Sequence, residues 1–362
     1  MRLWQLIALA LAVLVGGFAL IVVYAPLGCP TPHLVMEARF PAGGRQRRLM
    51  AADNLAVVVR PGGWVQVVAH PKSEPTSEWR KVAQTAQWIS DWADGPKGPG
   101  GQRVSFRAPT EPGTYEVRHV LAVGYEGTSG WARWSGVTVH AGRSVFVLVP
   151  RPTPKPWQGW IGEYEIGDYP AGTQPPPEFV KVTLGAASAR LSEHYRLDEF
   201  ASPGSTYPRF TVVSYALLDK LEALTGALQE QGYLRDALAV YSVYRTPLHN
   251  AEVGGATRSH HLWGRAADFI VDERFPAGEM DDLNGDGRTD IRDAMVVGGV
   301  VRELERWGVV VKGGTGVYQE ARPNGDLNAS VHVDVRGTPA KWARDYRTPG
   351  DREHWQNVRW EE

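Results

Sequence analysis

Three side chains in the C-terminal half of the chain are of the types that bind zinc in enzymes. His261 and Asp268 lie seven residues apart with Gly264 between them, so a loop and the strand that it feeds can bring them together. His332 lies within residues 330–336, where Val alternates with polar residues as on the two faces of a strand. A catalytic zinc needs three protein ligands and one open position. The sequence therefore predicts a zinc site of His261, Asp268 and His332; a plain solvated strand face is the alternative for the polar residues around His332.

A second group of oxygen-bearing side chains follows the spacing of a calcium loop. Residues 282–293 carry them at loop positions 1, 3, 5, 9 and 12, with Gly287 at position 6. Asp293 stands where the EF-hand pattern has a bidentate Glu, and this ending resembles the loops of dockerin modules. The prediction is a structural Ca²⁺ site in an insertion, and the alternative is a solvated acidic turn. The candidate ligands are Asp282, Asn284, Asp286, Arg288 at position 7, Asp290 and Asp293.

The region that carries the predicted zinc site has an α+β pattern. Helical periodicity is present at residues 215–231 and 294–307, and short strand-like runs lie between and after them. We assign residues 191–347 to this domain, with the insertion at 282–293 and a C-terminal tail at 348–362. Residues 151–190 are rich in Pro, Gly and aromatic residues, which predicts an extended, semi-rigid linker that packs along a neighbouring domain.

Residues 30–150 have the pattern of an all-β domain. Short Val-rich runs bounded by Gly and Pro recur along this part of the chain, and a Gly-Thr-Tyr segment at 113–115 enters a late strand. The pattern resembles an immunoglobulin-like β-sandwich. Such a domain is expected to serve as a spacer or binding module, or simply to add stability.

The first residues predict a membrane anchor. Residues 3–23 form an apolar stretch of about the length that spans a bilayer; Arg2 precedes it, and the next positive charge is Arg39. The positive-inside rule then puts the rest of the chain outside the cytoplasm. We assign residues 1–28 to a transmembrane signal-anchor helix. The alternatives are a cleaved signal peptide and a lipoprotein-type cleavage before Cys29.

Composition excludes several classes of protein. The apolar fraction of 43% and charged fraction of 22% are near globular averages, so most of the chain should fold. The single Cys29 excludes an intramolecular disulfide and a multi-thiolate metal cluster. A net charge of −1 gives no electrostatic case for nucleic acid as a partner.

Several ordered motifs resemble the M15 family of zinc peptidases. They are Tyr244-Arg-Thr-Pro-Leu-His-Asn-Ala-Glu-Val-Gly-Gly-Ala, then Ser-x-His-x-x-Gly-x-Ala-x-Asp from Ser259, then His-Val-Asp-Val-Arg-Gly from His332. The segment from Leu191 also looks like the start of that domain. The family includes D-Ala-D-Ala carboxypeptidases and murein endopeptidases, and it shares a fold with the hedgehog signalling domain. The resemblance covers about residues 191–346 and implies this fold, with the three ligands predicted above.

The resemblance also implies roles for neighbouring residues. Arg245 matches an Arg that helps to hold substrate, and Tyr244 lies beside it in the same motif. Ser259 is expected to contact substrate or to support the geometry of a ligand. A structural ion pair is the alternative for Arg245.

Hydrolysis further requires a carboxylate that takes and returns a proton near the metal. Asp334 lies two residues beyond His332 on the same strand face, which favours it as the general base. Its alternative role is to orient His332. Asp326 is the rival base, because its spacing of six residues before His332 is similar to that of an acidic residue in hedgehog-like relatives.

The predicted function is zinc-dependent hydrolysis of peptidoglycan stem peptides or cross-links, as a DD-carboxypeptidase or an endopeptidase. Such peptides lie outside the membrane, which agrees with the predicted topology: a single-pass protein of a bacterial cytoplasmic membrane with its C-terminal domains in the periplasm or outside the cell. The alternative is a non-catalytic wall-binding or scaffold protein in which the metal is structural.

Overall fold

The structure is a computed structural model. It describes residues 14–15, 18–19, 32–72, 79–129, 132–204, 206–273, 278–321, 327–346 and 356–357. Within these residues, no helix is long and apolar enough to cross a membrane. Of the predicted anchor at residues 1–28, only the short strands β1 (Leu14–Val15) and β2 (Phe18–Ala19) are described. The remainder of that prediction, and most of the predicted tail at 348–362, lie outside the described residues.

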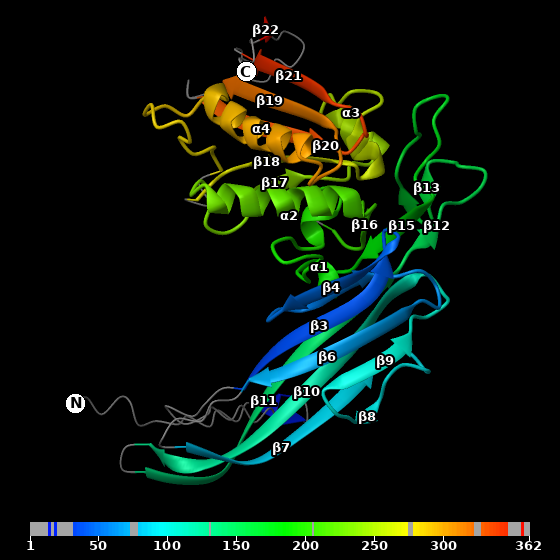
Figure 1. The fold of residues 1–362 in the computed structure, drawn as a ribbon. Coiled ribbons are helices and arrows are strands. Elements are labelled where there is room, and N and C mark those ends of the chain that lie inside the picture. Colours follow the sequence, from blue (N-terminus) through cyan, green and yellow to red (C-terminus); the bar gives the residue numbers. More distant parts are fainter. Residues whose placement is uncertain are drawn as a thin grey trace.

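Residues 33–149 form two sheets that pack face to face (Figure 1). The first sheet has the order β4-β3-β6-β9 and the second the order β5-β11-β10-β7-β8; β5 runs parallel to β11, and the other neighbours are antiparallel. The immunoglobulin-like identity of this sandwich stays a prediction. Its strands are β3 (His33–Ala42), β4 (Arg45–Ala51), β5 (Leu55–Val58), β6 (Trp64–Lys72), β7 (Trp79–Ser90), β8 (Gly98–Pro99), β9 (Arg103–Arg107), β10 (Gly113–Ser129) and β11 (Ala132–Val149).

A buried histidine gives this sandwich a predicted pH dependence. His119 is 1% exposed, packs edge-on against Trp88, and has no hydrogen-bond partner for either ring nitrogen among the described residues. Burial lowers the pKa of His119 below its ordinary value of 6.5. Below about pH 6.5 the unfolded chain binds a proton at this residue, whereas the folded core disfavours that proton. The free energy of unfolding should therefore decrease as the pH is lowered.

The test compares the wild type with His119→Leu in denaturant titrations between pH 7.5 and about pH 5. We expect the Leu variant to be more stable by about 1 kcal/mol or more, because it removes an unpaired buried polar group. The difference between the two proteins should grow as the pH falls. A constant difference across the range would contradict the assignment.

The segment predicted as an extended linker is folded onto the C-terminal domain. Strand β15 (Glu178–Val182) pairs with β12 (Arg151–Pro152) and with β16 (Arg209–Thr211), while β13 (Trp160–Ile161) and β14 (Tyr164–Glu165) form a hairpin. The physical reason is the aromatic content of the segment, since burial of large rings away from water stabilises the folded chain. These rings and their neighbours form a small core of Ile161, Ile166, Tyr169, Phe179, Phe210, Tyr244 and Leu262.

The sandwich also docks directly on the C-terminal domain. The backbone of Arg190 accepts from the Ala56 N–H at 2.8 Å and donates to the Asn54 carbonyl at 2.8 Å. The Arg47 guanidinium binds the Asp219 carboxylate through two nitrogens, at 2.8 and 3.0 Å, and lies over the Tyr215 ring. A bidentate ion pair has a defined geometry, so these contacts orient the sandwich on the C-terminal domain.

The C-terminal domain is built on a six-stranded sheet of order β17-β18-β20-β19-β21-β22, with α2 and α4 over one face (Figure 1). Val331 and Val333 of β20 face these helices, as the strand alternation predicted, and are fully buried. The elements are α1 (Leu184–Ala187), η2 (Asp198–Phe200), α2 (Tyr215–Glu230), β17 (Ala239–Ser242), α3 (Pro247–Glu252), η3 (His260–Trp263), β18 (Ala266–Ile270), α4 (Ile291–Arg306), β19 (Gly314–Ala321), β20 (Leu327–Asp334), β21 (Ala340–Tyr346) and β22 (Gln356–Asn357).

Local sequence explains where the two long helices begin. Ser214 caps α2 by accepting from the Leu217 N–H. At α4, Asp290 and Asp293 form a reciprocal capping box, in which each side chain accepts from the backbone N–H of the other residue. The observed bounds agree with the helical periodicity at 215–231 and 294–307, because both helices place their apolar residues against the sheet.

Candidate metal centre

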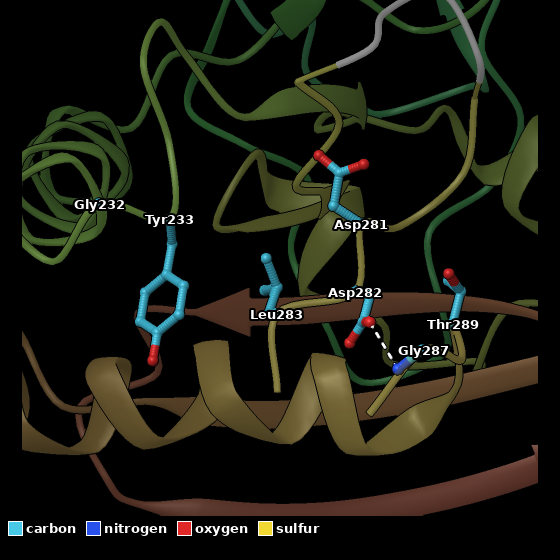
Figure 2. Close-up of a pocket in the computed structure, with 7 residues that line it drawn as sticks. All are labelled: Gly232, Tyr233, Asp281, Asp282, Leu283, Gly287 and Thr289. Atoms are coloured by element: carbon cyan, nitrogen blue, oxygen red, sulfur yellow. Dashed lines mark hydrogen bonds between the residues drawn. The ribbon is translucent and has the colours of Figure 1, made fainter. Parts of the chain in front are cut away.

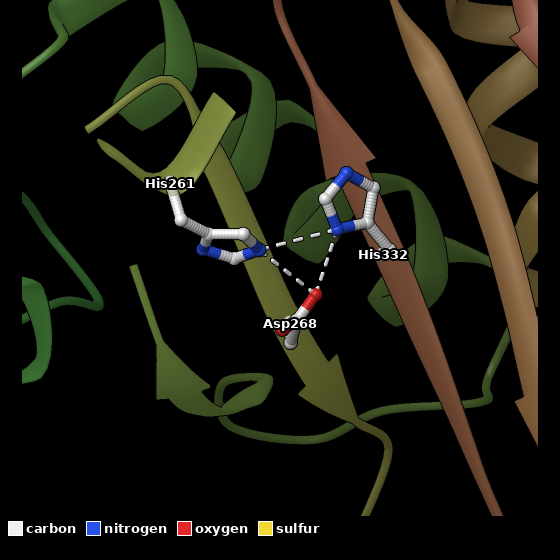
Figure 3. Close-up of side chains that lie close together, drawn as sticks. All are labelled: His261, Asp268 and His332. Atoms are coloured by element: carbon white, nitrogen blue, oxygen red, sulfur yellow. Dashed lines mark hydrogen bonds and ion pairs between the residues drawn. The ribbon is translucent and has the colours of Figure 1, made fainter. Parts of the chain in front are cut away.

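His261, Asp268 and His332 converge on the face of the sheet opposite α2 and α4 (Figure 3). His332 Nδ1 lies 2.7 Å from Asp268 Oδ1, and His261 Nε2 lies 3.2 Å from that oxygen and 3.3 Å from His332 Nδ1. Tetrahedral ligands about 2.0–2.1 Å from a zinc ion would lie roughly 3.3 Å apart. The donor set and its spacing therefore fit such an ion. Among the described residues, these three side chains form the one group whose ligand atoms lie close enough together to hold a metal ion.

The fold brings these three residues together in two ways. Asp268 and His332 are direct partners across the antiparallel pair β18–β20. His261 lies on η3, which ends at Gly264 before the chain turns into β18. Gly264 has φ +59, and a β-carbon there would lie 2.0 Å from the Val212 carbonyl oxygen, so only glycine fits.

Each candidate ligand is held by a partner of its own. The His261 Nδ1–H donates to the Val243 carbonyl at 2.7 Å, which turns the Nε2 lone pair toward the other two ligands. The Arg245 guanidinium binds Asp268 Oδ2, leaving Oδ1 for the metal side. On the far edge of the His332 ring, Nε2 lies 3.6 Å from Asp334 Oδ2. Such partners fix the tautomer and orientation of metal ligands.

The electrostatics of the group favour metal binding. Burial lowers the pKa of His261, so its ring is neutral. Burial alone would raise the pKa of Asp268, but the His261 and His332 rings hold it well below its usual range. Burial likewise opposes charge on His332, yet the Asp268 and Asp334 carboxylates raise its pKa above the ordinary value. A cation placed between the three ligands would take over the role of the proton on His332.

Asp334 does not have the geometry of a general base. Its side chain is fully buried behind His332, and it accepts from the Gly314 N–H at 2.8 Å and from the Arg336 backbone and guanidinium. Burial alone would raise its pKa, but His332 and Arg336 hold it well below its usual range. The structure thus favours the alternative role, in which Asp334 orients His332. The strand alternation gave the correct face of β20, but it carried no information on the groups that surround the carboxylate.

Asp326, the rival base, lies outside the described residues.

The orienting role of Asp334 can be measured. We expect Asp334→Asn to weaken Zn²⁺ binding by about 10–100-fold, because loss of a residue that orients a metal ligand has that effect at other metal sites. Competition with a chromophoric chelator measures the affinity. Asp272→Asn is the matched control: it also alters a buried carboxylate, but one outside the cavity and bonded to the Gly278 N–H. Equal affinities of the two variants would argue against the role.

Two of the residues assigned to substrate binding have other contacts in the structure. Tyr244 is fully buried and does not line the cavity; its hydroxyl lies 3.2 Å from that of Tyr169 in the aromatic core. Arg245 lines the cavity, but its guanidinium is bound to Asp268 and, through Nε, to Ser242 Oγ at 2.7 Å. Ser259 lines the cavity beside η3. The Tyr-Arg motif therefore links the metal centre to the aromatic core.

The acidic loop at 282–293 is organised by its own hydrogen bonds (Figure 2). Asp282 accepts from the N–H groups of Gly285 and Gly287 at 2.8 and 2.7 Å. Both carboxylate oxygens of Asp293, at position 12, accept hydrogen bonds from backbone N–H groups. Oδ1 accepts from Leu283 and Asn284, and Oδ2 accepts from Asp290. The structure thus lends no support to the predicted calcium site. The remaining candidates are engaged within the loop as well, since Arg292 pairs with Asp286 and Asp290, and the Arg288 N–H donates to Asp286.

The metal centre opens into a cavity of about 420 Å³ between η3, the loop after α3, and the strands β19–β21. The predicted site did not include His260 or the wall from β19 and β21. The alternation of Trp342, Arg344 and Tyr346 could have indicated that wall, because it puts three large side chains on one strand face. The wall and rim residues that were not predicted include Tyr241, Arg258, His260, Tyr318, Glu320, Arg336, Trp342, Arg344 and Tyr346.

Comparison with known proteins gives one match. Residues 197–284 match the family model described as Peptidase M15. No match was found among curated proteins or among solved structures. The matched segment includes Arg245, His261 and Asp268, while His332 lies beyond it on the strand that pairs with β18. Residues 197–284 are therefore similar to the M15 peptidase family, and they contribute two of the three side chains of the candidate metal centre.

Proposed function

We propose that the protein is a zinc-dependent peptidase that hydrolyses peptide bonds in peptidoglycan stem peptides or their cross-links. The observation that carries this proposal is the number of ligands. Among the described residues, three ligating side chains converge, and they open into a cavity. Structural zinc sites are closed by four protein ligands, whereas catalytic sites keep one position for water or substrate.

A zinc ion at this position would polarise the scissile carbonyl and promote attack by water. The protein supplies the orientation of the three ligands through Val243, Arg245 and Asp334. Of the acid–base side chains that line the cavity, His260 and Glu320 are not among the ligands, so we propose that proton transfer involves one of these.

The charges of the cavity support an acidic peptide as substrate. Four arginines line it, namely Arg245, Arg258, Arg336 and Arg344, against the carboxylates of Asp268 and Glu320. Peptidoglycan stems carry free carboxylates, which arginine binds well.

We propose further that the protein works outside the cytoplasmic membrane, with residues 1–28 as its anchor. We also propose that residues 282–293 bind calcium only where a second state of the loop frees the Asp293 carboxylate.

The test is digestion of purified peptidoglycan by the full chain after metal removal and after addition of Zn²⁺. We expect new peptide products with Zn²⁺ and none in the metal-free protein. Mass analysis then separates loss of one D-Ala, as by a carboxypeptidase, from opening of a cross-link, as by an endopeptidase. If the zinc-loaded protein binds peptidoglycan but releases no product, the second candidate function, a non-catalytic wall-binding protein, is the better account.

A further inference from the structure

One wall of the cavity is made by an indole ring that lies over two glycines. Trp342 of β21 crosses β19 at Gly314 and Gly316: a β-carbon at Gly316 would lie 2.4 Å from the Trp342 Nε1, and one at Gly314 would lie 2.9 Å from the ring. The ring reaches the candidate metal centre, because its centroid lies 5.3 Å from that of His332. Any larger residue at Gly316 would displace this wall.

The indole holds a tyrosine in a defined state. The Trp342 Nε1–H donates to the Tyr318 hydroxyl oxygen at 2.7 Å. An indole nitrogen can only donate, so the phenol oxygen must be the acceptor. The proton of Tyr318 is then directed elsewhere, and among the described residues no protein acceptor takes it. The side chain lines the cavity, so this O–H is available to a bound substrate.

The sheet register places the indole that holds this hydroxyl over the direct partner of a metal ligand. Gly316 is the direct partner of His332 across β19–β20. The backbone of Tyr318 pairs with Ser330. Its hydroxyl, however, contacts the Trp342 Nε1, which lies over Gly316, the partner of His332, so the hydroxyl lies toward His332. Burial raises the pKa of Tyr318 to about 12, and the negative charge of Asp268 adds to this effect. The phenol therefore keeps its proton at neutral pH.

We propose that Tyr318 is a catalytic residue, which donates a hydrogen bond to the scissile carbonyl oxygen as that oxygen gains negative charge, and that Trp342 is the residue that positions it. The inference rests on the proposed peptidase function. Tyr318 keeps its proton throughout, so no bond to it is formed or broken. A positioned donor of this kind acts on the transition state more than on the bound substrate.

The test compares Tyr318→Phe with the wild type on the same peptide substrate. We expect kcat to fall by about 10²–10³-fold, with KM changed by less than about threefold, and with unchanged zinc content and melting temperature. Trp342→Phe keeps a ring but loses the donor, so it should show a smaller loss of kcat. Tyr233→Phe, outside the cavity, is the matched control and should retain full activity.

A phosphinate pseudopeptide, which mimics the charged tetrahedral state, provides a readout that does not need turnover. We expect its affinity for zinc-loaded Tyr318→Phe to fall by about the same factor as kcat. An unchanged kcat, a change in KM alone, or equal phosphinate affinity would overturn the inference. If the wild type hydrolyses no substrate, the proposed function fails separately, and phosphinate affinity alone decides whether Tyr318 recognises a developing oxyanion.

Discussion

His261→Ala is expected to lose its bound zinc and to lower kcat/KM by at least about 10³-fold. A metal-bound carbonyl gains several kcal/mol of transition-state stabilisation, and each 1.36 kcal/mol corresponds to a factor of ten. His261 supplies one of three converging ligand atoms, and its side chain is 2% exposed. Two remaining ligands cannot retain the ion in an active position. Metal analysis after dialysis and steady-state kinetics measure the two effects.

The control is His249→Ala, which removes a histidine of α3 that pairs with Glu252 and does not line the cavity. It should keep its zinc and its activity. Activity of His261→Ala in excess Zn²⁺ equal to that of the wild type would rule out the three-ligand assignment. Loss of activity with normal zinc content would instead indicate that His261 acts in substrate binding.

Replacing Lys220 with Met is expected to cost about 3–5 kcal/mol of unfolding free energy, because it leaves a buried carboxylate unpaired. Lys220 lies on α2 and is fully buried; its Nζ donates to Glu305 Oε1 at 2.6 Å and to the Asp334 carbonyl at 2.8 Å. Burial lowers the pKa of Lys220, and Glu305 opposes that shift. The same Glu305 oxygen accepts from the Gly313 N–H. The Lys220–Glu305 pair thus connects α2 and α4 to the start of β19 and to the end of β20.

Denaturant unfolding of three variants separates pairing from packing. Lys220→Met alone should be far less stable than the double variant Lys220→Met with Glu305→Met, because the double variant removes both charges of the pair. Arg80→Ala, which removes an exposed ion pair with Glu126, should have little effect. A single Lys220 variant as stable as Arg80→Ala would show that the buried pair contributes nothing. Reduced zinc affinity of the double variant would show that the pair also positions the end of β20.

The sequence could indicate the types of residue at the metal centre and the elements that carry them. Period-two alternation put Val331 and Val333 on the core side of β20 and His332 on the other, and helical periodicity located α2 and α4. These are local features: the pitch of a helix and the pleat of a strand decide them before any tertiary contact forms. The same local reasoning predicted a calcium loop at 282–293, where the structure shows the Asp293 carboxylate in the capping box of α4.

Only the tertiary structure decided what surrounds each of these side chains. Spacing places Asp334 on the face of His332, but the Gly314 N–H and the buried Lys220 network come from elements remote in sequence. The motif that contains Tyr244 predicted a place beside the substrate. In the structure, Tyr169 of the segment 151–190 packs against Tyr244, and the two hydroxyls lie within hydrogen-bond distance. The wall of Trp342 over Gly316 likewise depends on the parallel register of β19 and β21. Which side chains could bind a metal follows from residue type and local period; which of them are bonded, buried or open to a substrate follows from contacts between distant segments.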